Sequence, residues 1–226
     1  MKRPRNTLII MTRRPRWGLG KERLAASLGP GAAWHFQRFA LEALVRRLGR
    51  DRRWHLEVAV TPDGATRGSG RWVGGHPRYP QGSGDLGERM LLQLEGKGTP
   101  PGPRLVIGAD IPGVVPPLIA LGFRLLKTHD WVLGPALDGG FWAIGSRRHP
   151  WRPPDLAGIA WGSAEALIQT RGRLKGTLAF LPFLADVDEA ESLRLWRRSF
   201  QGKIGGAARS RNLSALPGAS SFIAPE

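Results

Sequence analysis

Short apolar runs rich in valine, isoleucine and leucine alternate along this chain with longer stretches of helical periodicity. Thr7–Met11 has the composition of a buried strand, whereas Ala32–Leu48 places Phe36 and Ala40 among apolar side chains four residues apart. Further strands are predicted at 56–60, 105–108, 131–134, 141–145 and 178–184, and further helices at 85–94, 116–126, 163–170 and 189–198. Residues 64–84 are rich in glycine and proline and predict a long loop or an irregular excursion. The alternation predicts an α/β fold with a mostly parallel sheet covered by helices on both faces.

The length of 226 residues, 41% of them hydrophobic, suits one core. We predict a single domain over residues 1–200 and a flexible tail, small, polar and glycine-rich, over 201–226. The chain has no cysteine, which excludes disulfides and thiolate chemistry. The apolar run 8–11 is too short for a signal peptide, and no stretch approaches a membrane span. We therefore expect a cytoplasmic protein.

The formal net charge of +16 suits an anionic partner. Nucleic acid, a nucleotide, a phosphorylated metabolite and a membrane surface are all compatible with it. The basic residues are spread along the chain, so an arginine-rich composition alone also accounts for the excess. The nine tryptophans and eight phenylalanines fall mainly in predicted core elements, without a platform of strand aromatics for base stacking. This distribution argues against nucleic acid.

Three loops follow predicted strands and should share one crevice, because ligands of such sheets bind beyond the carboxyl ends of the strands. They are the basic loop after Met11, the GADIP turn after 105–108 and the PALDGG turn after 131–134. GLGKE in the first loop resembles the end of a phosphate-binding Walker A loop, but Pro15 and Glu22 replace residues that this motif requires. GSGDLG at 82–87 lacks the preceding strand of a dinucleotide site, and the five histidines have no zinc-site spacing.

Two acidic positions follow strands and are candidate metal ligands. Asp110 comes directly after the predicted strand 105–108, where a carboxylate can hold Mg²⁺ or Mn²⁺, although an aspartate here can also cap a turn. Asp186 and Asp188 follow the last predicted strand and alternate, so they point to the same side in an extended chain. Either of them can instead cap the helix predicted at 189–198.

The ordered blocks MTRRPRWGLGKERLAASLG, QGSGDLGERM, IGADIP, VLGPALDGGFWAIG, WGSAEAL and LADVDEAESL resemble the bacterial selenodomain-associated transferases (transferase 1). This family is related to phospholactate guanylyltransferase and molybdenum-cofactor guanylyltransferase. The resemblance covers roughly residues 7–198. It implies the GT-A, or nucleotide-diphospho-sugar transferase, fold: a Rossmann-like three-layer α/β/α sandwich that binds a nucleotide at its first strand and loop.

The resemblance also implies site residues. It assigns nucleotide and phosphate binding to Arg13, Gly18, Lys21, Arg23, Asp85 and Arg89, and acceptor or sugar binding to Asp138, Gly139 and Gly140. It assigns the metal to Asp110 with Asp188 (or, as the second choice, Asp186), and catalytic roles to Asp138 and Lys21. The implied cofactor is Mg²⁺ or Mn²⁺, and fixed positive charge would stabilise the negative charge that grows on phosphate oxygens.

Three departures from the family pattern leave the substrate open. Glu22 stands where the family has threonine, Gly162-Ser163 follows Trp161 in place of Ser-Thr, and Phe141 replaces a tyrosine. We expect transfer of a sugar from a nucleotide sugar to an unknown small acceptor. The alternatives are nucleotidyl transfer to a phosphorylated acceptor and a non-catalytic anion or nucleic-acid binder. The sequence leaves the oligomeric state open.

Overall fold

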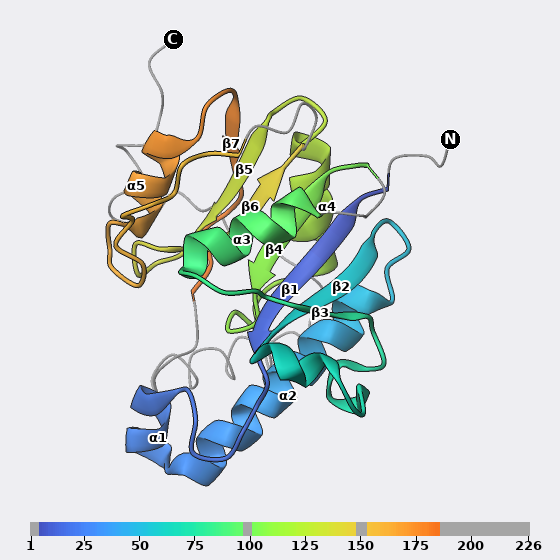
Figure 1. Cartoon of the computed structure of the whole chain (residues 1–226), viewed down its shortest axis with the longest axis vertical. Coiled ribbons are helices and arrows are strands. Elements are labelled where there is room, and N and C mark those ends of the chain that lie inside the picture. Colours follow the sequence, from blue (N-terminus) through green and yellow to red (C-terminus); the bar gives the residue numbers. More distant parts are fainter. Residues whose placement is uncertain (1–4, 97–100, 148–152, 186–226) are drawn as a thin grey trace, which may run out of the picture.

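A computed structural model describes residues 5–96, 101–147 and 153–185. Its seven strands form one sheet in the order β3-β2-β1-β4-β6-β5-β7 (Figure 1). The strands are β1 (Thr7–Arg13), β2 (His55–Thr61), β3 (Arg78–Pro80), β4 (Arg104–Gly108), β5 (Trp131–Pro135), β6 (Phe141–Ser146) and β7 (Leu178–Phe180). Only β6 runs antiparallel to its neighbours, β4 and β5. The predicted, mostly parallel α/β sheet is thus confirmed.

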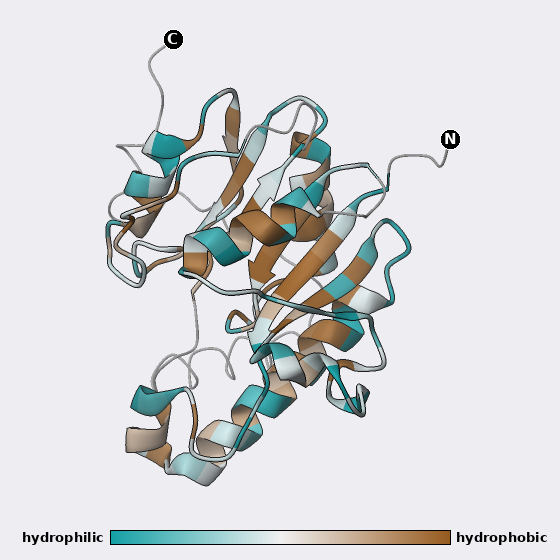
Figure 2. Ribbon diagram, viewed as in Figure 1, coloured by the Kyte–Doolittle hydropathy of each residue, from teal (hydrophilic) through white to brown (hydrophobic). Residues whose placement is uncertain are grey.

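Helices cover both faces of the sheet, because successive strand side chains point to opposite sides. On one face, α2 (Pro30–Gly49) and α4 (Pro116–Leu125) pack on alternate strand residues such as Leu8 and Ile10. On the other face, α3 (Leu86–Glu95) and α5 (Ala166–Arg173) pack on the intervening residues, including Ile9. Brown, hydrophobic segments mark the central strands β1 and β4 in Figure 2.

The first helix and the start of the second extend beyond the sheet. Here α1 (Glu22–Leu28) and the first half of α2 project from the body of the molecule (Figure 1). They have a small core of their own, made by Leu24, Ala33, Phe36 and Ala40. The helix predicted from residue 32 begins earlier, since Pro30 is accommodated in the first turn, where its missing N–H costs no hydrogen bond.

The segment 64–84, predicted as a long loop or an irregular excursion, includes short ordered elements. It contains most of the 3₁₀ turn η1 (Asp63–Thr66), the 3₁₀ turn η2 (Arg71–Val73) and the strand β3, which pairs with β2. The late strand predicted at 178–184 is also shorter, ending at Phe180. The predicted helix 189–198 and tail 201–226 lie outside the described residues. Among the described helices, none combines the length and the apolar character needed to cross a membrane.

Candidate functional site

The basic loop after β1 and the turn after β4 meet at the carboxyl ends of these strands. The Lys21 Nζ lies 3.0 Å from Asp110 Oδ1. The two strands are adjacent and parallel, and the backbone N–H of Ala109 donates to the carbonyl of Met11 at 3.2 Å. The lysine side chain is 4% exposed and the aspartate side chain 59% exposed. The structure therefore brings together a predicted phosphate-binding residue and a predicted metal ligand.

Lys21 has an unusual backbone conformation. It precedes the first turn of α1 with φ 53° and ψ 45°, which is left-handed and the one such non-glycine conformation among the described residues. Left-handed backbone costs a residue with a Cβ roughly 1–2 kcal/mol, and such strain gathers at functional sites. Gly18 (φ 71°) and Gly20 (φ 80°) precede it in the same loop. The loop geometry thus turns Lys21 inward, toward Asp110.

The basic loop carries further charged residues on either side of Lys21. Arg13 ends β1 and Arg23 lies in the first turns of α1, and both residues are exposed. Glu22, the departure from the family pattern, is also exposed and begins α1. A negative charge is favourable there because the helix dipole is positive at this end. Glu22 therefore has a favourable position at the start of α1, in addition to any effect of its charge on phosphate binding.

A cavity of about 260 Å³ opens beside Asp110. Asp138 and Gly140 of the turn after β5 also line it, so two of the three predicted loops meet in one cavity. Its remaining wall is largely apolar and includes Met90, Phe141 and Trp161. Apolar walls with a few polar groups at defined points are typical of small-molecule sites.

Packing of the glycine turn fixes the position of Asp138. Its Oδ1 accepts a hydrogen bond from the backbone N–H of Gly140 at 3.0 Å. Gly139 has φ 86°, and a Cβ on it would lie 2.3 Å from the carbonyl oxygen of Ala164. The Gly139 carbonyl accepts from the N–H of Leu167 at 3.1 Å. The turn is thereby held against the segment before α5, and the exposed Asp138 carboxylate is oriented at the cavity.

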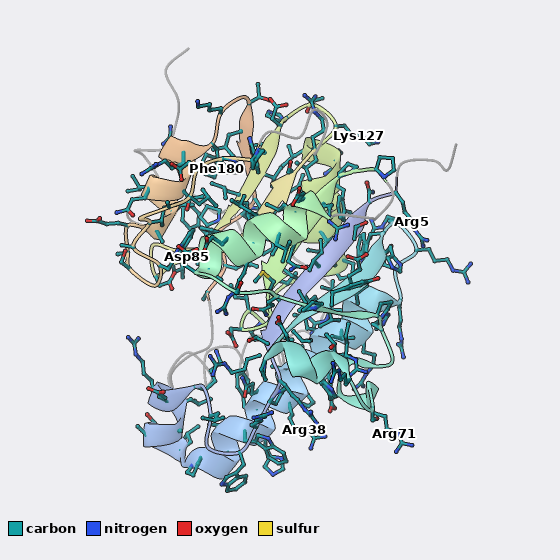
Figure 3. The ribbon with its side chains drawn as sticks, in the orientation of Figure 1. Arg5, Arg38, Arg71, Asp85, Lys127 and Phe180 are labelled. Atoms are coloured by element: carbon teal, nitrogen blue, oxygen red, sulfur yellow. The ribbon has the colours of Figure 1, made fainter. Side chains whose placement is uncertain are left out.

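Asp85 and Arg89 make local contacts that order the start of α3. Asp85 caps the helix: its Oδ1 accepts from the Glu88 N–H at 2.9 Å, and the Glu88 carboxylate accepts from the Asp85 N–H at 2.8 Å. The Arg89 Nε donates to the Gly84 carbonyl at 2.9 Å. Figure 3 labels Asp85 at the beginning of α3. Leu86, the next residue, lines the cavity, so these contacts also shape one of its edges.

We expect the Asp85 cap to stabilise the fold in a pH-dependent way. The Glu88 N–H bond lowers the pKa of Asp85 below its ordinary value, with smaller contributions that include Arg89. This stabilisation is present above the unfolded pKa of about 3.9 and is lost as the pH falls through the lower folded pKa. Asp85→Ala should reduce the free energy of unfolding by about 1 kcal/mol at pH 7, measured by urea denaturation, and by less in acid.

Asp85→Asn is the matched control, because asparagine also caps helices but carries no charge. It should keep most of the stability at pH 7. If Asp85→Asn folds normally but loses nucleotide affinity, Asp85 has the binding role that the family resemblance implies. Equal stability losses in both variants would contradict the capping contribution.

The described residues supply part of a divalent-cation site. Asp110 offers an exposed carboxylate just after β4, where its Oδ1 contacts the Lys21 Nζ. No group of three potential ligands occurs among the residues that the structure describes, and Asp186 and Asp188 lie outside them. One carboxylate fits Mg²⁺, which takes the rest of its ligands from water and substrate phosphates.

Sequence reasoning missed the apolar side of the cavity. Leu86, Met90 and Trp161 come from α3 and from the segment before α5, which are far apart in sequence. Trp161 belonged to a recognised block, but no local pattern indicates that it faces the same space as Asp110. Only the packing of α3 and α5 on one face of the sheet brings these side chains together.

The strand order and the crevice at the ends of β1, β4 and β5 define a nucleotide-diphospho-sugar transferase type of α/β fold. The chain belongs to a family of proteins described as uncharacterized and conserved in bacteria (DUF2064), which matches residues 44–163. No curated protein matches the sequence.

Solved structures agree with this fold. A candidate nucleotide-diphospho-sugar transferase from Desulfovibrio desulfuricans G20 is 26% identical, with a TM-score of 0.76 and 87% of each chain covered. The 4-diphosphocytidyl-2C-methyl-D-erythritol synthase of Anaerococcus prevotii DSM 20548 is 9% identical, with a TM-score of 0.55, covering 88% of this chain and 96% of that chain. Rv0371c of Mycobacterium tuberculosis H37Rv is 14% identical, with a TM-score of 0.52 and coverage of 86% and 98%. The last two similarities show the shared fold, as the sequence blocks predicted.

Proposed function

We propose that this chain is a cytoplasmic, divalent-ion-dependent transferase that moves a sugar from a nucleotide sugar to a small acceptor. The observation that carries the proposal is the contact of Lys21 with Asp110, which lines the same cavity as Asp138. One crevice thus holds a cationic group for phosphates, Lys21, a carboxylate for a metal ion, Asp110, and a second carboxylate, Asp138. The fold shared with the Desulfovibrio protein supports the same class of reaction.

Each residue has a distinct task in the proposed reaction. Lys21, with the exposed Arg13 and Arg23 nearby in the chain, would attract the donor diphosphate and stabilise its charge as it leaves. Asp110 would hold the divalent ion, which neutralises phosphate charge when bound. Asp138 would accept the proton of the attacking acceptor hydroxyl, because its carboxylate is already oriented by the Gly140 N–H. The apolar wall would exclude water from the transferred group.

Product analysis tests the proposal directly. The purified chain is incubated with Mn²⁺ and a panel of nucleotide sugars or nucleoside triphosphates, and the released products are separated by anion-exchange chromatography. Sugar transfer releases a nucleoside diphosphate, whereas nucleotidyl transfer to a phosphorylated acceptor releases pyrophosphate. Asp138→Asn should reduce sugar transfer by about 100-fold, the lower range for one positioned proton-transfer group.

The variant also separates the two reactions. Nucleotidyl transfer needs no general base when the attacking phosphate is already ionised. Pyrophosphate release that is unaffected by Asp138→Asn would therefore replace the sugar-transfer proposal with nucleotidyl transfer. If Asp110→Asn binds nucleotide with the same Mn²⁺ dependence as the unaltered protein, the metal assignment is wrong.

A further inference from the structure

A second hollow lies between the end of α2 and η2, apart from the proposed transfer site. It has a volume of about 360 Å³ and shares no lining residue with the cavity at Asp110. Helix α2 packs on the sheet face opposite α3, whose residues Leu86 and Met90 border the transfer cavity. The lining residues of the hollow are Glu42, Val45, Arg46, Gly49, Arg50, Arg71, Gly74 and His76.

Three guanidinium groups give the hollow its charge. Arg46 lies in the last turn of α2 and Arg50 is its C-cap residue, four positions later and one turn along the helix. Arg71 approaches from η2 and is labelled at the surface in Figure 3. All three residues are exposed, and none forms an ion pair with a residue that the structure describes. The one carboxylate of the lining, Glu42, already pairs with Arg38 at 3.3 Å.

Glycines allow the floor of the hollow to form. A Cβ on Gly49 would lie 2.4 Å from the His76 Nε2, so the imidazole packs directly on the helix backbone. Gly74 ends η2 with φ 61°, which turns the chain toward His76. Burial, and then the neighbouring His55, lower the pKa of His76. The ring is therefore neutral at pH 7, and the positive charge of the hollow comes from the arginines.

We propose that this hollow binds a small oligophosphate, independently of the transfer reaction. Guanidinium groups donate paired hydrogen bonds that match phosphate oxygens, and they keep their charge throughout the physiological pH range. A diphosphate offers several negative charges to three unpaired cations approaching from two elements. The volume is within the range of small-ligand pockets, about 300–1,000 Å³. The ligand is defined by its linked phosphates, whether they are free or end a larger metabolite.

Glycine amides near each site allow the two sites to be followed separately. Inorganic pyrophosphate is titrated into ¹⁵N-labelled full-length protein, and backbone amide shifts are recorded by NMR. Gly74 and Gly75 report on the hollow, and Gly18 and Gly20 report on the loop of the transfer site. We expect the Gly74 and Gly75 signals to move and saturate. Lys21→Met should leave this titration unchanged, even if it abolishes the response of Gly18 and Gly20.

Two double variants with equal loss of charge decide the proposal. Arg46→Gln/Arg71→Gln should weaken the affinity reported by Gly74 and Gly75 by about tenfold or more, since it removes two charge-assisted donors. Arg124→Gln/Arg171→Gln removes two exposed arginines from the last turns of α4 and α5 and should have little effect. Equal weakening in both would assign the response to the overall positive charge. Absence of saturable shifts at Gly74 and Gly75 would overturn the site.

The same titration with an adenosine-capped diphosphate shows which source of phosphate the hollow accepts. A similar affinity for both probes means that only the linked phosphates are bound. A larger response to the capped probe, with further shifts around His76, means that the hollow also holds the group attached to them. Both results retain the proposal, and the proposed transfer activity can fail without affecting either.

Discussion

Lys21→Met should weaken nucleoside diphosphate binding by about tenfold or more and monophosphate binding by less, because a charge-assisted hydrogen bond contributes about 1.5–3 kcal/mol. Lys21 Nζ lies 3.0 Å from Asp110 Oδ1, so it can neutralise this carboxylate and would reach phosphates bound to a divalent ion that Asp110 is proposed to hold. Methionine keeps an unbranched apolar side chain and removes the charged ammonium group with its hydrogen-bond donors. Calorimetric titrations with each nucleotide, with and without Mn²⁺, measure the difference.

The backbone of Lys21 provides a control that separates charge from strain. Lys21→Gly and Lys21→Ala both remove the amine, but only glycine adopts φ 53° without penalty. Lys21→Gly should therefore be more stable than Lys21→Ala by about 1 kcal/mol, while both bind the diphosphate equally weakly. Glu22→Thr should strengthen diphosphate binding, because it removes a negative charge next to Lys21. The effect should be largest at low salt, where charges are least screened. If Lys21→Met affects mono- and diphosphate equally, or neither, then the loop is not a diphosphate site.

Local sequence patterns predicted those helices and strands in which apolar residues recur at a regular spacing. The apolar runs at β1 and β4 and the helical period of α2 are strong signals, because these elements are buried in a continuous core. The strand β3 was not predicted within the glycine-rich segment 64–84, because only three residues pair there at the edge of the sheet. A strand this short, which includes a proline, lacks the alternation by which strands are recognised.

The candidate site was predictable where residues directly follow strands. The order of the strands in a parallel sheet explains why Asp110 and Asp138 reach one cavity. Asp85, which the family resemblance assigns to the nucleotide, caps helix α3 in the structure. Its position three residues before Glu88 is the spacing of a capping box. By contrast, the left-handed conformation of Lys21 could not be predicted, because lysine has no preference for it.

The least predictable feature is a buried ion pair between residues 47 apart in sequence. The Arg104 Nη2 lies 2.6 Å from Glu57 Oε2, with side-chain exposures of 2% and 7%. The Arg104 Nε also donates to the Gln93 carbonyl at 2.7 Å. Glu57 lies in β2, Arg104 in β4 and Gln93 in α3, so one side chain joins α3 to two strands that flank β1.

Arg104→Met should lower the free energy of unfolding by about 3–5 kcal/mol, because it removes the guanidinium that pairs with the buried Glu57 carboxylate and leaves it, among the described residues, only the His55 Nε2 at 3.9 Å. Glu57→Leu should also be destabilising, because it removes the carboxylate that pairs with the buried Arg104 guanidinium. The double variant, Glu57→Leu/Arg104→Met, should recover most of this loss, since two apolar groups of similar volume carry no desolvation penalty. Recovery should be incomplete, because the Gln93 carbonyl still loses a hydrogen bond in the interior. Urea denaturation of the three variants measures these differences. Additive losses in the double variant would show instead that the two side chains stabilise the fold independently, through their packing against α3 and the sheet.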